Sequence, residues 1–175
     1  MEIFDIVDEN NNVIGQADRT KCHSDKSLIH RVAHVIVVNA KGDIFLQKRA
    51  GNKDIQPGKW DTSVGGHLSR GETYLCAALR ETEEELGFRP ENIDFLYEYI
   101  MRSDKETEFV RTFLTFWEGN IKIEEEEISE GRFWDLKEIS INLGSGIFTP
   151  NFEEEYLRYK KWQKDLTNEQ NFIED

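Results

Sequence analysis

The segment from Gly66 to Phe88 constrains this chain most, because its residues repeat at the spacing of an α-helix. The spacing predicts a helix over Thr73 to Leu86, and Gly87 after it suits a left-handed C-cap. The residues expected on the buried side of this helix are Leu75, Ala78, Leu79, Thr82 and Leu86. The sequence therefore predicts a short amphipathic helix at a defined place in the chain.

Carboxylates gather on the other side of this predicted helix. At about 100° per residue, Glu81, Glu84 and Glu85 share a face that we expect to point into solvent, and Glu83 falls on the other flank. Like charges at spacings of three and four residues repel one another. A hard divalent cation that prefers carboxylate oxygen would reverse this repulsion. The spacing therefore predicts a magnesium or manganese site.

The segment resembles the Nudix box, G-x5-E-x7-R-E-U-x-E-E-x-G-U, where U is a bulky aliphatic residue. The residues that match the fixed positions are Gly66, Glu72, Arg80, Glu81, Glu84, Glu85 and Gly87. Thr82 and Phe88 depart from the pattern at its U positions. A solvated acidic helix is the alternative interpretation, but it does not explain the spacing of the glycines and the arginine. The resemblance implies an α/β (α+β) Nudix fold, a mixed β-sheet sandwiched between helices.

Composition limits the function classes. The chain has 175 residues and 38% hydrophobic residues, which suits a single globular domain. We assign residues 1–165 to a single Nudix domain and 166–175 to a polar C-terminal tail. A net charge of −13 argues against nucleic acid and anionic membranes as partners, because both need a positive field. The same charge repels a polyphosphate, so bound cations and local Arg or Lys side chains must neutralise the pocket.

The chain carries no recognisable export or membrane segment. Its first residues are acidic and lack the apolar stretch of a signal peptide, and no apolar run approaches the length of a membrane span. Cys22 and Cys76 lie in no metal or redox spacing and are expected to be reduced. We therefore expect a cytoplasmic protein.

Strand-like segments flank the predicted helix on both sides. The predicted strands are Glu2–Val7, Val13–Gly15, Val32–Val38, Ile44–Lys48, Trp60–Val64, Ile93–Arg102, Glu108–Glu118 and Phe133–Leu136. A second helix is predicted over Phe152–Lys164, opened by Pro150 and Asn151. This order suits the mixed sheet that the resemblance implies.

Further motifs resemble the isopentenyl-diphosphate isomerase branch of the Nudix superfamily, over about Ile3 to Thr149. The stretches that carry this likeness are Arg19–His23, His30–Ala33, Gln47–Ala50 and Pro57–His67. The isomerases build a metal site from histidines and glutamates, and the residues that match it are His23, His30, His67, Glu106 and Glu108. Such a mixed nitrogen and oxygen shell suits zinc, manganese or magnesium, among which the sequence does not choose.

The same resemblance implies cationic contacts to a diphosphate. Arg19, Arg49 and Lys53 are the candidates for substrate binding, through guanidinium forks or a point charge. Without the resemblance, each would be read as an ordinary surface cation.

Two departures from the isomerase pattern favour a hydrolase. The isomerase cysteine before Gly-His is replaced by Gly65, which has no side chain to deliver a proton. The isomerase tryptophan after a late Ser-Pro, which steadies a carbocation, is replaced by Asn151. The arginine and glutamates of the box are all retained, whereas isomerases typically lose part of that pattern. The sequence thus predicts a Nudix-type diphosphate hydrolase, with isopentenyl-diphosphate isomerase as the alternative and a non-catalytic binding module third.

The expected reaction cleaves a diphosphate bond in a nucleoside diphosphate-type or related small molecule. The Gly65 carbonyl is implied as a further ligand of the metal held by the box glutamates. Glu81 is the first candidate for the general base, with Glu127 and Glu130 as the second. Glu72 and Arg80 are interpreted as a pair that orients the helix. The sequence specifies neither the substrate nor the oligomeric state.

Overall fold

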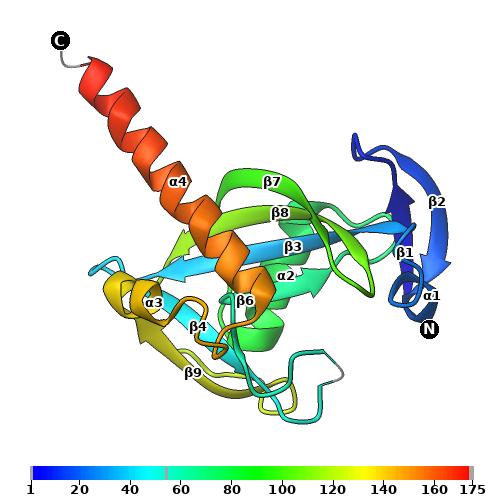
Figure 1. The fold of residues 1–175 in the computed structure, drawn as a ribbon, viewed down its shortest axis with the longest axis horizontal. Helices are drawn as coiled ribbons and strands as arrows, with labels where there is room; N and C mark the ends of the chain where they lie inside the picture. The colour runs from blue at the N-terminus through cyan, green and yellow to red at the C-terminus, as the bar shows by residue number, and fades with distance from the viewer. Residues whose placement is uncertain (1, 54, 174–175) are drawn as a thin grey trace.

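The computed structural model describes residues 2–53 and 55–173, with side chains described as far as residue 168. The described residues form nine strands in one mixed sheet (Figure 1). The strands are β1 (Ile3–Val7), β2 (Val13–Asp18), β3 (Ile29–Val38), β4 (Ile44–Arg49), β5 (Trp60–Asp61), β6 (Val64–His67), β7 (Asp94–Arg102), β8 (Thr107–Phe116) and β9 (Ile128–Trp134). The helices are α1 (Arg19–Cys22), α2 (Tyr74–Leu86), α3 (Leu136–Asn142) and α4 (Pro150–Ile173).

The central strand β3 organises the sheet. It pairs in parallel with β8 over its whole length, and β8 in turn pairs antiparallel with β7. The other edge of β3 is shared along its length by β1, then β6, then β4. In this register His30 lies opposite Glu108 of β8, and Val32 lies opposite His67 of β6. Residues distant in sequence therefore meet on one face of β3.

Helices cover both faces of the sheet, with α4 in front of it and α2 behind it in Figure 1. Val35 and Val37 of β3 belong to a buried cluster with Ala77 and Ala78 of α2. Ile36 points to the opposite face, because side chains alternate along a strand. The α4 residues that share its cluster are Phe152, Tyr156 and Tyr159. The predicted fold, a mixed sheet sandwiched between helices, is confirmed.

The orientation of α2 differs from the predicted one. Its ends are capped as expected, with Gly87 in the left-handed region at φ 71°. Leu75, however, is 47% exposed, and Tyr74 and Ala77 are buried in its place. Helical periodicity fixes which residues share a face, but contact with the sheet fixes how the helix is turned about its axis.

The polar β9 begins earlier than predicted. The sequence predicted a strand over 133–136, but pairing with β4 extends it from Ile128 to Trp134. Much of β9 is exposed or half-buried, so apolar alternation gives little signal there. The predicted strand over 60–64 is divided instead, with β5 ending at Asp61 and β6 beginning at Val64.

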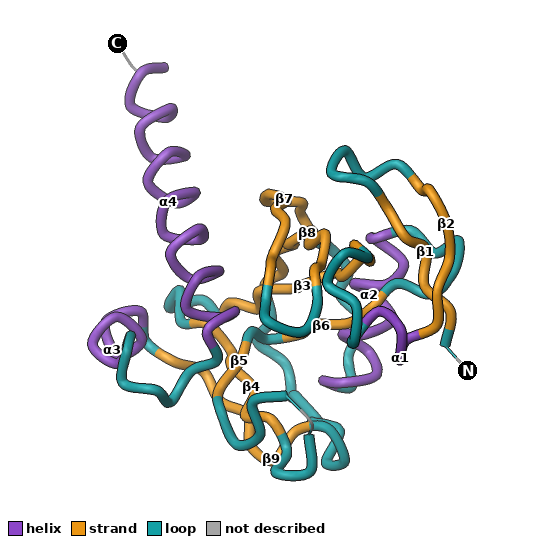
Figure 2. The backbone as a smooth tube through the Cα atoms, turned by 45° about the vertical axis from the view of Figure 1, so that its right-hand side comes forward, coloured by secondary structure: helices purple, strands orange, loops and turns teal. Residues whose placement is uncertain are grey.

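Helix α4 is longer than predicted. It begins at Pro150 and continues to Ile173, so most of the expected tail is helical, and positions 174–175 lie outside the described residues. Its C-terminal part extends away from the sheet in both views (Figures 1 and 2). Among the described residues, no helix is both long and apolar enough to cross a membrane.

Candidate active site and metal centre

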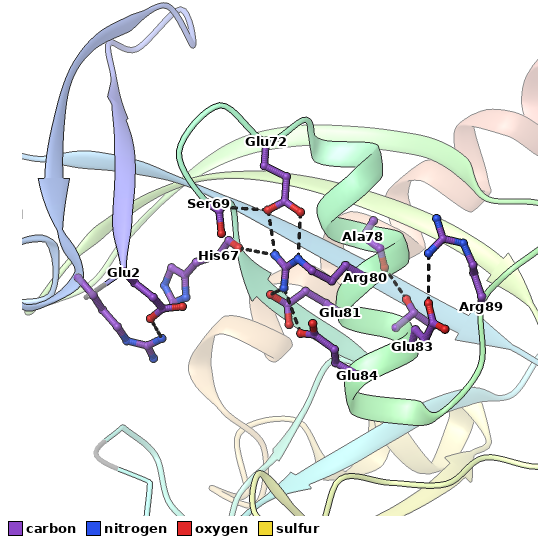
Figure 3. A network of polar contacts seen from close by, with 12 residues as sticks. Glu2, His67, Ser69, Glu72, Ala78, Arg80, Glu81, Glu83, Glu84 and Arg89 are labelled. Carbon is purple, nitrogen blue, oxygen red and sulfur yellow. Dashed lines mark hydrogen bonds and ion pairs between the residues drawn. The ribbon is translucent and has the colours of Figure 1, made fainter.

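The arginine of the box helix binds several partners. Arg80 donates from Nε and Nη2 to the two carboxylate oxygens of Glu72, each at 2.9 Å (Figure 3). Its Nη2 also donates to the carbonyl oxygen of His67 at 3.1 Å. The predicted pairing of Glu72 with Arg80 is therefore present, and it ties the loop before α2, the helix itself and strand β6 together.

The same guanidinium holds the first acidic residues of the box. Nη1 of Arg80 donates to Glu81 at 2.7 Å and to Glu84 at 3.1 Å. The Glu81 side chain crosses directly over Gly66, where an added Cβ would lie 2.0 Å from its Cδ. Glycine at position 66 is thus what lets the Glu81 carboxylate reach the site. Burial, opposed by Arg80, raises the pKa of Glu81 above its ordinary value.

Glu85 is buried, which corrects the prediction that its face points into solvent. Its side chain turns toward β4, where Nε2 of Gln47 donates to it at 2.7 Å. Burial, and next the charge of Glu81, raise the pKa of Glu85 to about 8. Glu84 is exposed as predicted. A cation beside Glu81 and Glu85 would favour the charged forms of both carboxylates. Charged carboxylates are the form that a metal ion needs as ligands.

A second cluster joins histidines from three parts of the chain. His23 follows α1, His30 lies on β3 and His67 ends β6, and a ligand atom from each lies within 4.8 Å of the others and of Glu106. The Nε2 atoms of His23 and His67 are 3.3 Å apart. Glu108 is adjacent, with Oε1 at 3.8 Å from His30 and 3.7 Å from His67. The structure thus brings together all the residues predicted for the second site.

The donor atoms of this cluster fit a cation. Both ring nitrogens of His30 and Oε2 of Glu106 are buried without a hydrogen-bond partner among the described residues. Leaving such atoms unpaired costs about 1–3 kcal/mol each, which a bound metal would offset. Burial, and next the neighbouring imidazoles, lower the pKa of His30 to about 4 and that of His67 below its usual range. Neutral imidazole is the form that binds a metal.

The Glu108 carboxyl of this second cluster is also perturbed by its surroundings. Burial, and next the charge of Glu106, raise the pKa of Glu108 to about 8. A divalent cation would displace its proton, so metal binding is expected to release protons near neutral pH.

Both clusters open into one cleft of about 730 Å³. Glu81, Glu84 and Glu85 line it together with His23, His67 and the second-site glutamates. Gly65 also lines it, and its backbone N–H favours the charged form of Glu85. The two predicted metal sites are therefore parts of one continuous cavity.

The predicted substrate-binding cations line the same cleft. Arg49 bonds Asp61 at 3.2 Å and the carbonyl oxygen of Ile55 at 2.8 Å, so its guanidinium is held in place. Arg19 pairs with Glu2 at 2.8 Å at the rim. Lys53 and Glu127 form an ion pair within the lining.

Of the two late glutamates proposed as alternative bases, only Glu127 is at the cleft. Glu130 pairs with Lys48 at 3.6 Å and is absent from the described lining. A role for Glu130 as the base is therefore unsupported.

The sequence interpretation missed His34 and Glu155. His34 lines the cleft, and its Nδ1 lies 3.1 Å from both carboxylate oxygens of Glu155 on α4. The alternation His30, Val32, His34 along β3 is a signal that places His34 on the same face as the histidine cluster. No local signal identifies Glu155, which is 121 residues away.

The sequence profile of the NUDIX domain matches residues 28–152, more than half of the chain. The chain belongs to the Nudix hydrolase family. It is 34% identical to an uncharacterized Nudix hydrolase of Streptomyces coelicolor over 167 residues, which cover 93% of this chain and 90% of that protein. The predicted membership of the Nudix superfamily is thus confirmed.

Similarity also extends to the isomerase branch of the superfamily, as predicted. The chain is 29% identical to isopentenyl-diphosphate Delta-isomerase 1 of Photorhabdus laumondii, over 89% of this chain and 93% of that protein. Among solved structures, DR0079 of Deinococcus radiodurans has a TM-score of 0.79 at 23% identity, over 90% of this chain and 98% of that chain. This last likeness concerns the Nudix fold alone.

Proposed function

We propose that this Nudix protein hydrolyses a diphosphate bond in a nucleoside diphosphate-type or related organic diphosphate. The observation that carries the proposal is the convergence of Glu81, Glu84 and Glu85 on a cleft that cationic side chains also line. In the reaction, the water oxygen forms a bond to one phosphorus. The bond between that phosphorus and the bridging oxygen breaks, and the bridging oxygen leaves with the electron pair as part of the other phosphate. Phosphoryl transfer of this kind depends on positioning and on charge neutralisation.

The box residues are assigned the metal-binding and water-activating roles. The Gly65 carbonyl and the carboxylates of Glu81, Glu84 and Glu85 would hold Mg²⁺ or Mn²⁺. When bound, such an ion neutralises phosphate charge and makes water more acidic. Glu81 is the first candidate to take the proton from water, because its carboxylate lines the cleft and is held there by Arg80. Glu127 is the second candidate, since it lines the cleft.

The substrate would be gripped by cations of the lining. Arg49 presents a guanidinium already fixed by Asp61, which suits a phosphate oxygen. Arg19 and Lys53 would contribute after exchanging their present carboxylate partners for phosphate. The second site, of His23, His30, His67, Glu106 and Glu108, would hold Zn²⁺ or Mn²⁺.

The assembled second site is the observation that favours the alternative, isopentenyl-diphosphate isomerase. Position 65, where the isomerase resemblance requires a cysteine, is glycine at the cleft, and Asn151 lines the cleft in place of the tryptophan. Val32 and Ile55 are the only aliphatic side chains in the described lining. An isoprenoid tail would find little apolar surface there. These features support hydrolysis over isomerisation.

Product analysis tests this choice. The protein is incubated with Mg²⁺ or Mn²⁺ and a panel of nucleotides, dinucleotides, nucleotide sugars and isoprenyl diphosphates. We expect phosphate monoesters from at least one organic diphosphate, and no deuterium incorporation into isopentenyl diphosphate in heavy water followed by NMR. Rapid isomerisation without hydrolysis would overturn the proposal and make the alternative correct.

The compartment is part of the same proposal. Cys22 is buried and Cys76 is exposed, and both are free thiols. Free thiols suit a reducing compartment, which supports the cytoplasm.

A further inference from the structure

A buried ion pair connects α4 to the cleft. Glu155 is 1% exposed, and both of its carboxylate oxygens lie 3.1 Å from Nδ1 of His34. The Thr112 hydroxyl on β8 donates to the same carboxylate at 2.7 Å. Neither Glu155 nor Thr112 lines the cleft, whereas His34 does. The imidazole is thus the one part of this group that reaches the substrate cavity.

The pair fixes which edge of the ring faces outward. Because Nδ1 is committed to Glu155, the opposite edge, with Cδ2 and Nε2, points away from α4. Among the described residues, Nε2 of His34 has no hydrogen-bond partner, yet it is absent from the buried unpaired atoms. Nε2 is therefore accessible from the cleft, which His34 lines.

Gly65 keeps this edge uncovered. Gly65 lies opposite His34 in the β3–β6 ladder, and an added Cβ would lie 3.3 Å from Cδ2 and 3.4 Å from Nε2. Any side chain at position 65 would therefore cover part of the imidazole edge. The glycine that stands in place of the isomerase cysteine also exposes a nitrogen in the cleft.

We propose that Nε2 of His34 donates a hydrogen bond to a phosphate oxygen of the substrate, and that Glu155 is the positioning residue that holds the ring for it. The inference rests on the proposed function. It adds one contact to the substrate phosphate beside the contacts proposed for Arg19, Arg49 and Lys53. An anion suits this position, because Nδ1 of His34 is held against the Glu155 carboxylate at 3.1 Å and Nε2 is the ring nitrogen left to contact the cleft.

A binding experiment with inorganic diphosphate and Mg²⁺ tests the contact. The unmodified protein, His34→Gln and Glu155→Gln are compared by titration calorimetry. Loss of a hydrogen bond to a charged group should weaken binding about 10- to 100-fold in His34→Gln. Tyr156→Phe is the matched control, because it removes a bond from α4 to the carbonyl oxygen of Leu136 at 2.8 Å outside the cleft. It should bind diphosphate as the unmodified protein does.

A second measurement, by NMR, uses the unmodified protein and so does not depend on whether a variant folds. The protein has four histidines, so the ¹⁵N signals of His34 can be resolved and followed during diphosphate titration. We expect the Nε2 signal of His34 to shift at saturation. An unchanged Nε2 signal, or an affinity of His34→Gln for diphosphate equal to that of the unmodified protein, would overturn the inference. If the unmodified protein still binds diphosphate in that case, the hydrolase proposal stands. Absence of diphosphate binding and of hydrolysis in the unmodified protein would overturn both.

Discussion

At Gly66, addition of a single methyl group should lower the catalytic rate and leave the protein folded. In Gly66→Ala the new Cβ would lie 2.0 Å from Cδ of Glu81 and 2.2 Å from its Cγ and Oε1. Ordinary contact begins at 3.4 Å, so the Glu81 carboxyl must move by about 1.4 Å, the difference between 3.4 and 2.0 Å. The obstacle is a flexible side chain, so the backbone can stay in place.

A displacement of this size removes Glu81 from its working position. Misplacing a reacting group by about 1 Å can cost on the order of 100-fold in rate, so kcat should fall at least that much. Stability should change little, because Arg80 keeps its bonds to Glu72 and Glu84 when Glu81 moves. We expect the free energy of unfolding to fall by about 1 kcal/mol, the value of one hydrogen bond.

The assay is Mg²⁺-dependent phosphate release from the best diphosphate of the panel, alongside thermal unfolding. Gly15→Ala is the matched control, because position 15 is exposed and has nothing within 4 Å of an added Cβ. The double variant Gly66→Ala with Glu81→Gln should be no slower than Glu81→Gln alone. A folded Gly66→Ala protein with unchanged kcat would refute the assignment of Glu81 to catalysis.

Three other predictions follow from the same geometry. The double variant Glu84→Gln, Glu85→Gln should lose activity by orders of magnitude yet unfold at no lower denaturant concentration, because burial of ionised Glu85 is unfavourable; full activity would contradict the box assignment. Manganese at about 100 times its Kd should stabilise the protein by about 2.7 kcal/mol, and His30→Ala should reduce this gain in thermal unfolding. Burial opposes the charge of His34, but Glu155 outweighs burial and raises the pKa to about 9; its stabilisation is complete below about pH 6.5 and is lost as pH rises through 9. Glu155→Gln should remove that part of the pH dependence in chemical unfolding, and an unchanged slope would contradict the ion pair.

The box helix could be predicted because its signals are local. The C-cap at Gly87 and the pairing of Glu72 with Arg80 depend on residues within one short segment, and both are present. The burial of Glu85 and the exposure of Leu75 could not be predicted, since both depend on where β4 and the sheet lie relative to the helix.

The histidine cluster could be assembled from the sequence only through resemblance to a known family. His30 and Glu108 meet because β3 and β8 run in parallel, and His67 joins them through the pairing of β6 with β3. Such contacts depend on strand order and register, which apolar alternation does not specify. Glu155 was missed for the same reason, because its partner lies on a strand far away in the sequence.

Strand β6 connects the box carboxylates with the histidine cluster of the cleft. The N–H of Gly65 favours the charged form of Glu85, Gly66 lies beneath Glu81, and His67 belongs to the histidine cluster. Arg80 bonds both the carbonyl oxygen of His67 and the Glu81 carboxylate. Adjacent residues of one short strand thus position the proposed ligands of both sites, so a shift of β6 is expected to alter both. The glycines allow this sharing, because a side chain at either position would cover His34 or displace Glu81.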